Sequence, residues 1–228
     1  MPKRYRKTKP RFKKRVYRKR KSGPTITALK ANVVPDRLIV KLPYFNASSI
    51  TGTAGLSQDT QYRLNSIFDP EVAVAIGQSQ PLGVDQWNTF YNRYRVIGVS
   101  VKVTARNAGG DAAYVGMVAN NDTGSLLTEA AYEQSRTTMK MVGGTSGGHD
   151  VCVLKKWYNL ANLTGRPKSA YISDDRYQAQ FDADPLEAIH LHLCTQPVSA
   201  AVALNMHYSI RMVYLVELFD RKALAQSS

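Results

Sequence analysis

The chain has 228 residues and carries 31 lysines and arginines against 17 aspartates and glutamates, a formal net charge of +14 at pH 7. Without its basic N-terminal segment about 200 residues remain, enough for one substantial domain. We expect no membrane span, because no apolar run approaches the roughly 18 residues that one needs. We expect no secretory signal, because no apolar stretch follows the basic N-terminus. Two cysteines are too few for a disulfide scaffold.

The N-terminal arm, residues 1–21, contains 13 basic and no acidic residues. Its charges repel one another and few apolar residues oppose them, so we expect it to be disordered until it meets a polyanion. Lysine and arginine neutralise phosphates without reading sequence, and interspersed aromatic rings stack on unpaired bases. We therefore predict binding of single-stranded nucleic acid by Lys3, Arg4, Arg6, Lys7, Lys9, Arg11, Lys13, Lys14, Arg15, Arg18, Lys19, Arg20 and Lys21, with Tyr5, Phe12 and Tyr17 stacking.

Two other roles for the arm follow from its composition. A nuclear localisation signal needs only about 5–8 basic residues, so it is compatible with nucleic-acid binding and does not account for the whole arm. Attachment to a membrane surface is disfavoured because no amphipathic apolar face accompanies the charge.

The rest of the chain is predicted to be rich in β-strands. Strands are expected at 37–45, 61–68, 94–106, 113–119, 137–142, 149–158, 188–195 and 204–219. The strand 94–106 alternates, with Val99, Val101, Val103 and Ala105 on one face and Ser100, Lys102, Thr104 and Arg106 on the other. Two short helices are predicted: one capped by Asp85, with Trp87, Phe90, Tyr91 and Tyr94 on one face, and one at 128–135.

About eight strands in one domain favour a double-sheet jelly roll or a closed barrel. The segments 46–60 and 159–187 are predicted to be long loops, which usually carry interactions, here with other subunits or a receptor. Removing the arm's 13 basic residues leaves 18 against 17 acidic ones, so we expect the body to have no basic patch of its own. Lys30, Arg37 and Lys41 are nevertheless candidates for continuing the arm's contact with nucleic acid.

Residue patterns for catalysis are scarce. The glycine-rich segment 143–149 lacks the Lys-Ser/Thr ending of a phosphate-binding loop and is expected to be a flexible connection. His190, His192 and Cys194 share one face of a strand and could hold zinc with His207, but polar residues on the outer face of a half-buried strand explain them more simply. Asp174, Asp175, Asp182 and Asp184 could bind calcium, although a solvated acidic loop is the simpler interpretation. We predict a protein that is not an enzyme, with no metal and no cofactor.

Two segments resemble a known family. One is Asp85-Gln86-Trp87 with Phe90-Tyr91-Asn92-Arg93-Tyr94-Arg95-Val96 and the valine strand that follows; the other is the last strand, 208–219. After a basic N-terminus, these segments resemble the capsid proteins of circoviruses and circovirus-like viruses with circular single-stranded DNA. The arm is shorter and richer in lysine than in circoviruses proper, which favours a circovirus-like relative.

The resemblance implies an all-β, eight-stranded double-sheet jelly roll of the viral capsid type, with residues 1–35 as arm and linker, 36–220 as the capsid domain and 221–228 as a tail. It implies self-assembly into an icosahedral T=1 shell of about 60 identical subunits. The arm would package single-stranded circular DNA and direct nuclear import, placing the protein in the virion and the host nucleus. Expected partners are the genome, other copies of the chain, nuclear import factors and a cell-surface receptor. A coat protein of a small RNA virus or satellite and a cellular nucleic-acid-binding protein with a basic tail remain alternatives.

Overall fold

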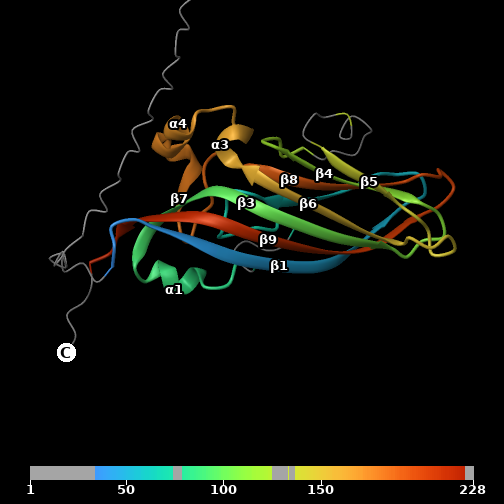
Figure 1. Cartoon of the computed structure of the whole chain (residues 1–228), viewed down its shortest axis with the longest axis horizontal. Helices are drawn as coiled ribbons and strands as arrows, with labels where there is room; N and C mark the ends of the chain where they lie inside the picture. Colours follow the sequence, from blue (N-terminus) through green and yellow to red (C-terminus); the bar gives the residue numbers. More distant parts are fainter. Residues whose placement is uncertain (1–33, 74–78, 125–132, 134–136, 224–228) are drawn as a thin grey trace, which may run out of the picture. The chain divides into compact units, whose positions relative to one another are not determined.

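The computed structural model describes residues 34–73, 79–124, 133 and 137–223, within the compact unit Val34–Ser228. Its strands form two antiparallel sheets (Figure 1). In the first sheet, β1 (Leu38–Gly52), β9 (Leu204–Arg221), β3 (Tyr91–Asn107) and β6 (Val151–Asn159) lie side by side in this order, and the short β7 (Gln178–Gln180) pairs with β3.

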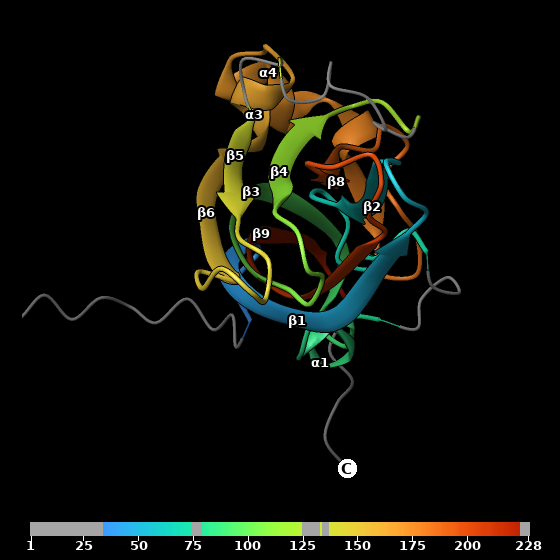
Figure 2. The ribbon, with the colours of Figure 1, turned by 90° about the vertical axis from the view of Figure 1, so that its right-hand side faces the viewer.

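The second sheet has the order β2 (Gln58–Arg63), β8 (His190–Pro197), β4 (Ala113–Asn120) and β5 (Thr138–Val142). Figure 2 looks along the strands and shows this sheet facing the first. If β7 is set aside, the pairs are nested: β1 pairs with β9, β2 with β8, β3 with β6, and β4 with β5. A long antiparallel hairpin rolled into two sheets has this order, which is that of a jelly roll. The predicted fold class is confirmed.

Apolar and polar side chains alternate along the long strands, so each strand has one face towards the core and one towards solvent. On β3, Val99, Val101, Val103 and Ala105 are at most 1% exposed, whereas Lys102 and Arg106 are exposed. On β9, six residues at every second position are buried: Tyr208, Ile210, Met212, Tyr214, Val216 and Leu218. A strand with this period has one apolar face for the core and one polar face for solvent, as the sequence predicted.

Tyrosine hydroxyls join the two sheets inside the core. The Tyr62 hydroxyl on β2 lies 2.8 Å from the Tyr208 hydroxyl on β9, and the Tyr214 hydroxyl donates to the carbonyl oxygen of Arg63 at 2.8 Å. Burial raises the pKa of both Tyr62 and Tyr214 above the ordinary value, which keeps these hydroxyls protonated donors. Buried polar groups that are hydrogen-bonded in this way fix how one sheet lies on the other.

The first predicted loop proved wrong. Strand β1 continues to Gly52 and β2 begins at Gln58, where a strand had been expected only from 61, so about two thirds of the segment 46–60 is strand. The extension is polar in sequence, but residues 46–52 pair with β9 as far as Leu204. Strand pairing therefore overrides a local composition that is typical of loops.

The second predicted loop, 159–187, was also wrong. It contains α3 (Leu160–Leu163), α4 (Lys168–Ser173), the 3-10 turn η1 (Asp175–Tyr177) and β7. Tyr171 anchors this segment, because its buried hydroxyl donates to the carbonyl oxygen of Val96 on β3 at 2.8 Å. The segment 143–149 does connect β5 to β6, as expected.

The first predicted helix is shorter than expected. Helix α1 (Val84–Asn88) has Gly83 rather than Asp85 at its N-cap, and Tyr91 and Tyr94 belong to β3. The expectation of one helical aromatic face was therefore wrong, although the Trp87 ring still contacts both Phe90 and Tyr91. Pairing of β3 with β9 from Tyr91 onward takes these residues out of the helix. Of the second predicted helix, 128–135, only Glu133 lies among the described residues.

Gly98 provides a test of close packing on the first sheet. It follows a register shift in β3, and a Cβ atom there would lie 2.6 Å from Cζ2 of Trp157 and 2.9 Å from the carbonyl oxygen of Tyr158. We expect Gly98→Ala to lower the free energy of unfolding by about 1–3 kcal/mol through overpacking. Gly110→Ala is the control, because nothing lies within 4 Å of its added Cβ. Equal urea midpoints for the two variants would contradict this account.

Candidate nucleic-acid interface

The predicted arm contacts, together with Lys30, lie outside the described residues and stay predictions. Of the predicted residues in the body, Lys41 is exposed on β1 and Arg37 precedes that strand. The side chain of Arg37 is 65% exposed, and its Nη1 lies 3.2 Å from Oε1 of Glu217. Its charge is thus already partly compensated, whereas Lys41 pairs across the sheet with the apolar Leu215.

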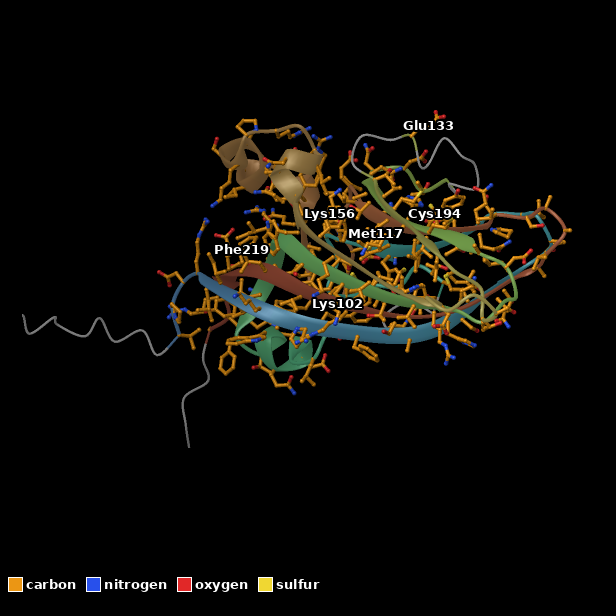
Figure 3. The ribbon with its side chains drawn as sticks, turned by 45° about the vertical axis from the view of Figure 1, so that its right-hand side comes forward. Lys102, Met117, Glu133, Lys156, Cys194 and Phe219 are labelled. Atoms are coloured by element: carbon orange, nitrogen blue, oxygen red, sulfur yellow. The ribbon has the colours of Figure 1, made fainter. Side chains whose placement is uncertain are left out.

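The first sheet turns one face away from the core, and we call it the outward face. On this face the register aligns Arg211 of β9 with Lys102 of β3, and Lys102 with Lys155 of β6. These three exposed residues form what we call the basic row (Figure 3 labels Lys102). The expectation that the body has no basic patch is therefore wrong, because a near-zero net charge does not require an even distribution.

Within the described part of the chain, no carboxylate lies within ion-pair distance of the basic row. Arg106 and Arg95 on the same face do have such partners, Asp150 at 2.8 Å and Glu217 at 3.4 Å, whereas the exposed Lys41 and Arg93 have none among the described residues. Like charges directly opposite one another on neighbouring strands destabilise a sheet. Repulsion within the basic row therefore destabilises the sheet, and no described carboxylate offsets it.

Two exposed aromatic rings flank the row. Phe45 pairs with Arg211 from the edge strand β1 and is 66% exposed, and Trp157 lies two residues from Lys155 on β6 and is 52% exposed. Lys102 and Lys155 also line a shallow hollow of about 470 Å³, to which Lys140 of β5 contributes a further cation. The outward face thus combines cations with exposed rings, the combination found in surfaces that bind single strands. Sequence reasoning placed Lys102 on the polar side of its strand but missed Lys155, Arg211, Phe45 and Trp157.

A buried ion pair lies near one end of the outward face. The side chains of Arg95 and Glu217 are only 5% and 11% exposed, and Arg95 Nη2 also donates to Gln178 of β7 at 3.0 Å. The Arg95 guanidinium lies 5.0 Å from the centroid of the Phe219 ring (labelled in Figure 3). Burial lowers the pKa of Arg95 and the charge of Glu217 raises it, so Glu217 is what makes a buried cation tolerable here.

The histidines and cysteine considered for zinc lie on the second sheet. His190, His192 and Cys194 are each at most 2% exposed, so the expectation of an outer, half-exposed position was wrong. Both ring nitrogens of His192 are hydrogen-bonded, Nδ1 to Asp59 at 2.8 Å and Nε2 to Asn120 at 2.9 Å. Burial raises the pKa of the Cys194 thiol to about 12, whereas zinc binds the thiolate.

His207 does not join this group. It lies on β9 in the first sheet and is exposed on the outward face. Among the described residues, no three or more His, Cys, Asp or Glu side chains are placed to hold a metal ion. The same region contains no helix long and apolar enough to cross a membrane.

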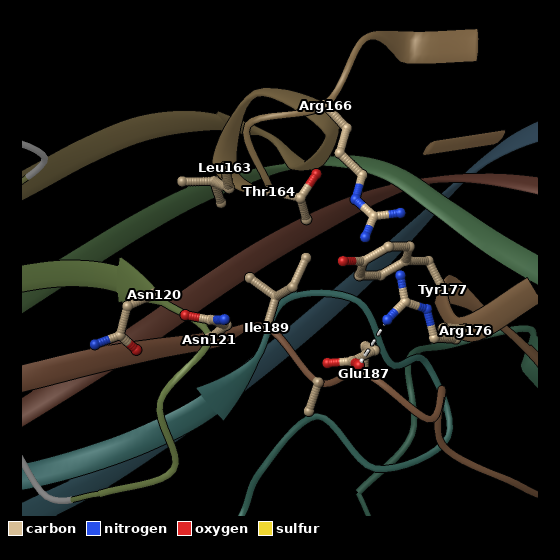
Figure 4. A pocket seen from close by; sticks show the side chains of 10 residues that line it. Asn120, Asn121, Leu163, Thr164, Arg166, Arg176, Tyr177, Glu187 and Ile189 are labelled. Atoms are coloured by element: carbon tan, nitrogen blue, oxygen red, sulfur yellow. Dashed lines mark hydrogen bonds and ion pairs between the residues drawn. The ribbon is translucent and has the colours of Figure 1, made fainter. Parts of the chain in front are cut away.

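The four aspartates considered for calcium are dispersed. Asp174 pairs with Arg166 and Arg176, Asp175 accepts from Gln178, and Asp184 accepts from Ser66. None of the four lines the nearby hollow of about 480 Å³, which is lined in part by Arg166, Arg176 and Glu187 (Figure 4). Since Asp174 and Glu187 already compensate these arginines, the hollow presents little free charge.

No protein-family model matches the chain, and no curated protein matches its sequence. Solved structures of similar fold include Desmodium yellow mottle tymovirus, at 10% identity over 90% of this chain and 100% of that chain, with a TM-score of 0.40. Tobacco necrosis virus matches at 11% identity over 82% and 97%, with a TM-score of 0.41. A virus-like particle of the nodavirus of the prawn Macrobrachium rosenbergii matches at 10% over 86% and 100%, with a TM-score of 0.42. The strand order within the two sheets, and not these similarities, is the basis for assigning the fold.

The buried ion pair predicts unequal effects of two substitutions. Glu217→Ala leaves the Arg95 guanidinium buried without its counter-charge, and we expect the free energy of unfolding to fall by about 3–5 kcal/mol. Arg37→Ala removes the exposed partner of the same carboxylate and should cost less than about 1 kcal/mol. Urea unfolding of both variants measures the difference; a Glu217→Ala variant as stable as Arg37→Ala would refute this role.

The burial of His190 leads us to expect that the folded state is less stable in mild acid. Burial, with His192 and Arg63 nearby, lowers its pKa from 6.5 to about 4 despite the opposing charges of Asp59 and Asp122, and its Nδ1 has no partner among the described residues. Between these pKa values the unfolded chain binds a proton that the folded chain does not. The contribution of the neutral His190 side chain to the free energy of unfolding should therefore be complete above about pH 6.5. It should decrease as the pH falls towards 4. In urea titrations across this range His190→Gln should flatten the decrease, and an unchanged pH profile would exclude His190 as its source.

Proposed function

We propose that the chain is a viral coat protein whose body forms a shell and whose arm holds a single-stranded genome. The observation that carries the proposal is the joining of a 13-charge polycation to a jelly-roll body with 18 basic and 17 acidic residues. Jelly rolls form viral capsids as well as lectin and cupin domains, and the polycation distinguishes among these. A near-neutral body also lets identical copies pack closely without strong mutual repulsion.

The arm is proposed to bind by counterion release. Each phosphate that a lysine or arginine neutralises frees a condensed counterion, so binding is strong, sensitive to salt and blind to sequence. This chemistry suits a container that must hold a whole genome. It also leaves the function without a catalytic step, in line with the prediction that the protein is not an enzyme.

The finer assignment rests on the resemblance to circovirus-like capsid proteins. It proposes a T=1 shell around circular single-stranded DNA, nuclear import through the arm, and a receptor on the host cell. The three viruses named above are not circoviruses, so a coat protein of an RNA virus is the main alternative. Phosphate neutralisation does not distinguish DNA from RNA.

Negative-stain microscopy of the purified full-length chain, followed by nuclease digestion of the nucleic acid that co-purifies, tests the proposal. We expect uniform closed shells whose contents are protected until the shell is opened. DNase sensitivity would favour the circovirus-like assignment, and RNase sensitivity the RNA-virus alternative. A monomer that binds duplex DNA with sequence preference would instead indicate a cellular nucleic-acid-binding protein.

Deletion of residues 1–21 separates the two parts of the proposed function. We expect a folded body with an unchanged urea midpoint that retains much less nucleic acid, because 13 cations have been removed. The measurements are urea unfolding and the ratio of absorbance at 260 to 280 nm. Loss of the folded body, or full retention of nucleic acid, would overturn the division of labour between arm and body.

A further inference from the structure

We infer that the outward face of the first sheet is a second binding surface for single-stranded nucleic acid, built around Arg211, Lys102 and Lys155. This inference rests on the proposed function and extends it from the arm to the folded body. The ligand class is an extended polyanion with unpaired bases, a description that both DNA and RNA single strands satisfy.

The first step of the argument is electrostatic. The three residues of the row lie directly opposite one another on adjacent strands, and neighbouring strands are about 4.8 Å apart. Arg106, two outward positions beyond Lys102 on β3, and Arg95, near the start of that strand, have carboxylate partners, whereas no described carboxylate pairs with the row. A bound polyanion would supply the missing counter-charge and remove the repulsion.

The second step concerns the shape of the face. The row crosses β9, β3 and β6 at right angles to the strands, and Phe45 and Trp157 lie on the two edge strands, β1 and β6. The edge strands are about 14 Å apart, three strand spacings. A strand of nucleic acid crossing the sheet can thus place phosphates over the cations and bases against the rings.

The third step concerns Trp157 itself. Its ring lies over Gly98, where a Cβ atom would be 2.6 Å from ring atom Cζ2. Glycine at this position lets the indole lie close to the sheet while 52% of the residue remains exposed. A ring supported from beneath and open above is suited to stacking on a base.

Another occupant of this face would be an acidic surface of a second copy of the chain. Asp174, Asp184 and Glu187 are already engaged with arginine or serine side chains, whereas Asp111 and Asp182 are exposed and have no ion pair among the described residues. The exposed rings beside the row favour nucleic acid over such an acidic surface, and a subunit contact becomes an outcome of the test.

Tryptophan fluorescence of the full-length chain provides the first test, since Trp87 and Trp157 are its only two tryptophans. The probes are a mixed-sequence single-stranded oligonucleotide made as DNA and the same sequence made as RNA. We expect quenching on binding that is lost in Trp157→Phe and retained in Trp87→Phe, the matched control. Quenching by one probe alone identifies the sugar that the face accepts. Quenching by neither, or undiminished quenching in Trp157→Phe, would overturn the inference.

The salt dependence of binding provides the second test. For single strands, each lost phosphate contact lowers the slope of log affinity against log salt by about 0.7. We expect this decrease in Lys102→Gln and about three times as much when Lys155→Gln and Arg211→Gln are added. Lys168→Gln, an equal change at an exposed lysine of α4, should leave the slope unchanged.

The outcomes also separate this inference from the proposed function. If all variants form shells that retain nucleic acid and none changes the slope, the arm alone binds the genome and the inference fails. If Lys102→Gln abolishes shells while the slope is unchanged, the face is a subunit contact and the inference fails. If the wild-type chain forms no shells and binds no nucleic acid, the proposed function itself is contradicted, and the inference that rests on it falls with it.

Discussion

Pairing of β9 between β1 and β3 is the interaction on which the rest of the structure depends. This strand aligns with β1 from Leu38 to Gly52 and with β3 from Tyr91 to Asn107. One of its faces supplies the core residues from Met206 to Leu218, including the tyrosines that bond to the second sheet. The other face carries Arg211 and Glu217, and so organises both the basic row and the buried ion pair. Without β9 the first sheet would separate into β1 on one side and β3 with β6 on the other.

Charge in the body is segregated rather than scarce. Carboxylates are concentrated in the loops and around the second sheet, for example Asp59, Asp122 and Asp174, whereas the outward face of the first sheet has Glu217 as its described acidic side chain. A body with almost no net charge can thus present a strongly basic surface in one direction. Under the proposed function, the basic face would contact a polyanion, and the low net charge of the body would limit repulsion between identical neighbours.

The strands with strong alternation could be predicted from the sequence because each carries its own signal. Val99 to Ala105 and Tyr208 to Leu218 have buried residues at period two, and both strands lie where expected. The polar residues 46–52 carry no such signal, and only pairing with β9 makes them a strand. The same applies to Tyr91, which a helical spacing placed on α1 and the sheet places on β3.

The candidate interface was hidden from the sequence for a related reason. Lys102, Lys155 and Arg211 are separated by more than fifty residues each in the chain, and only the register of three strands brings them into line. His190 and Cys194 were likewise taken for exposed residues, because a single strand does not reveal what packs over it. Composition alone predicts a polyanion-binding arm, but the arrangement of charge on the body depends on non-local pairing.

The position of β9 at the end of the folded region has a consequence during synthesis. Residues emerge from the ribosome in order, at about 5–20 per second, and domains fold as units once complete. The polycationic arm is therefore available to nucleic acid many seconds before the strand that closes the first sheet has been made. Under the proposed function, a nascent chain would be held at a nearby polyanion while its body is still unfolded, and completion of β9 would produce a folded subunit where nucleic acid is already bound.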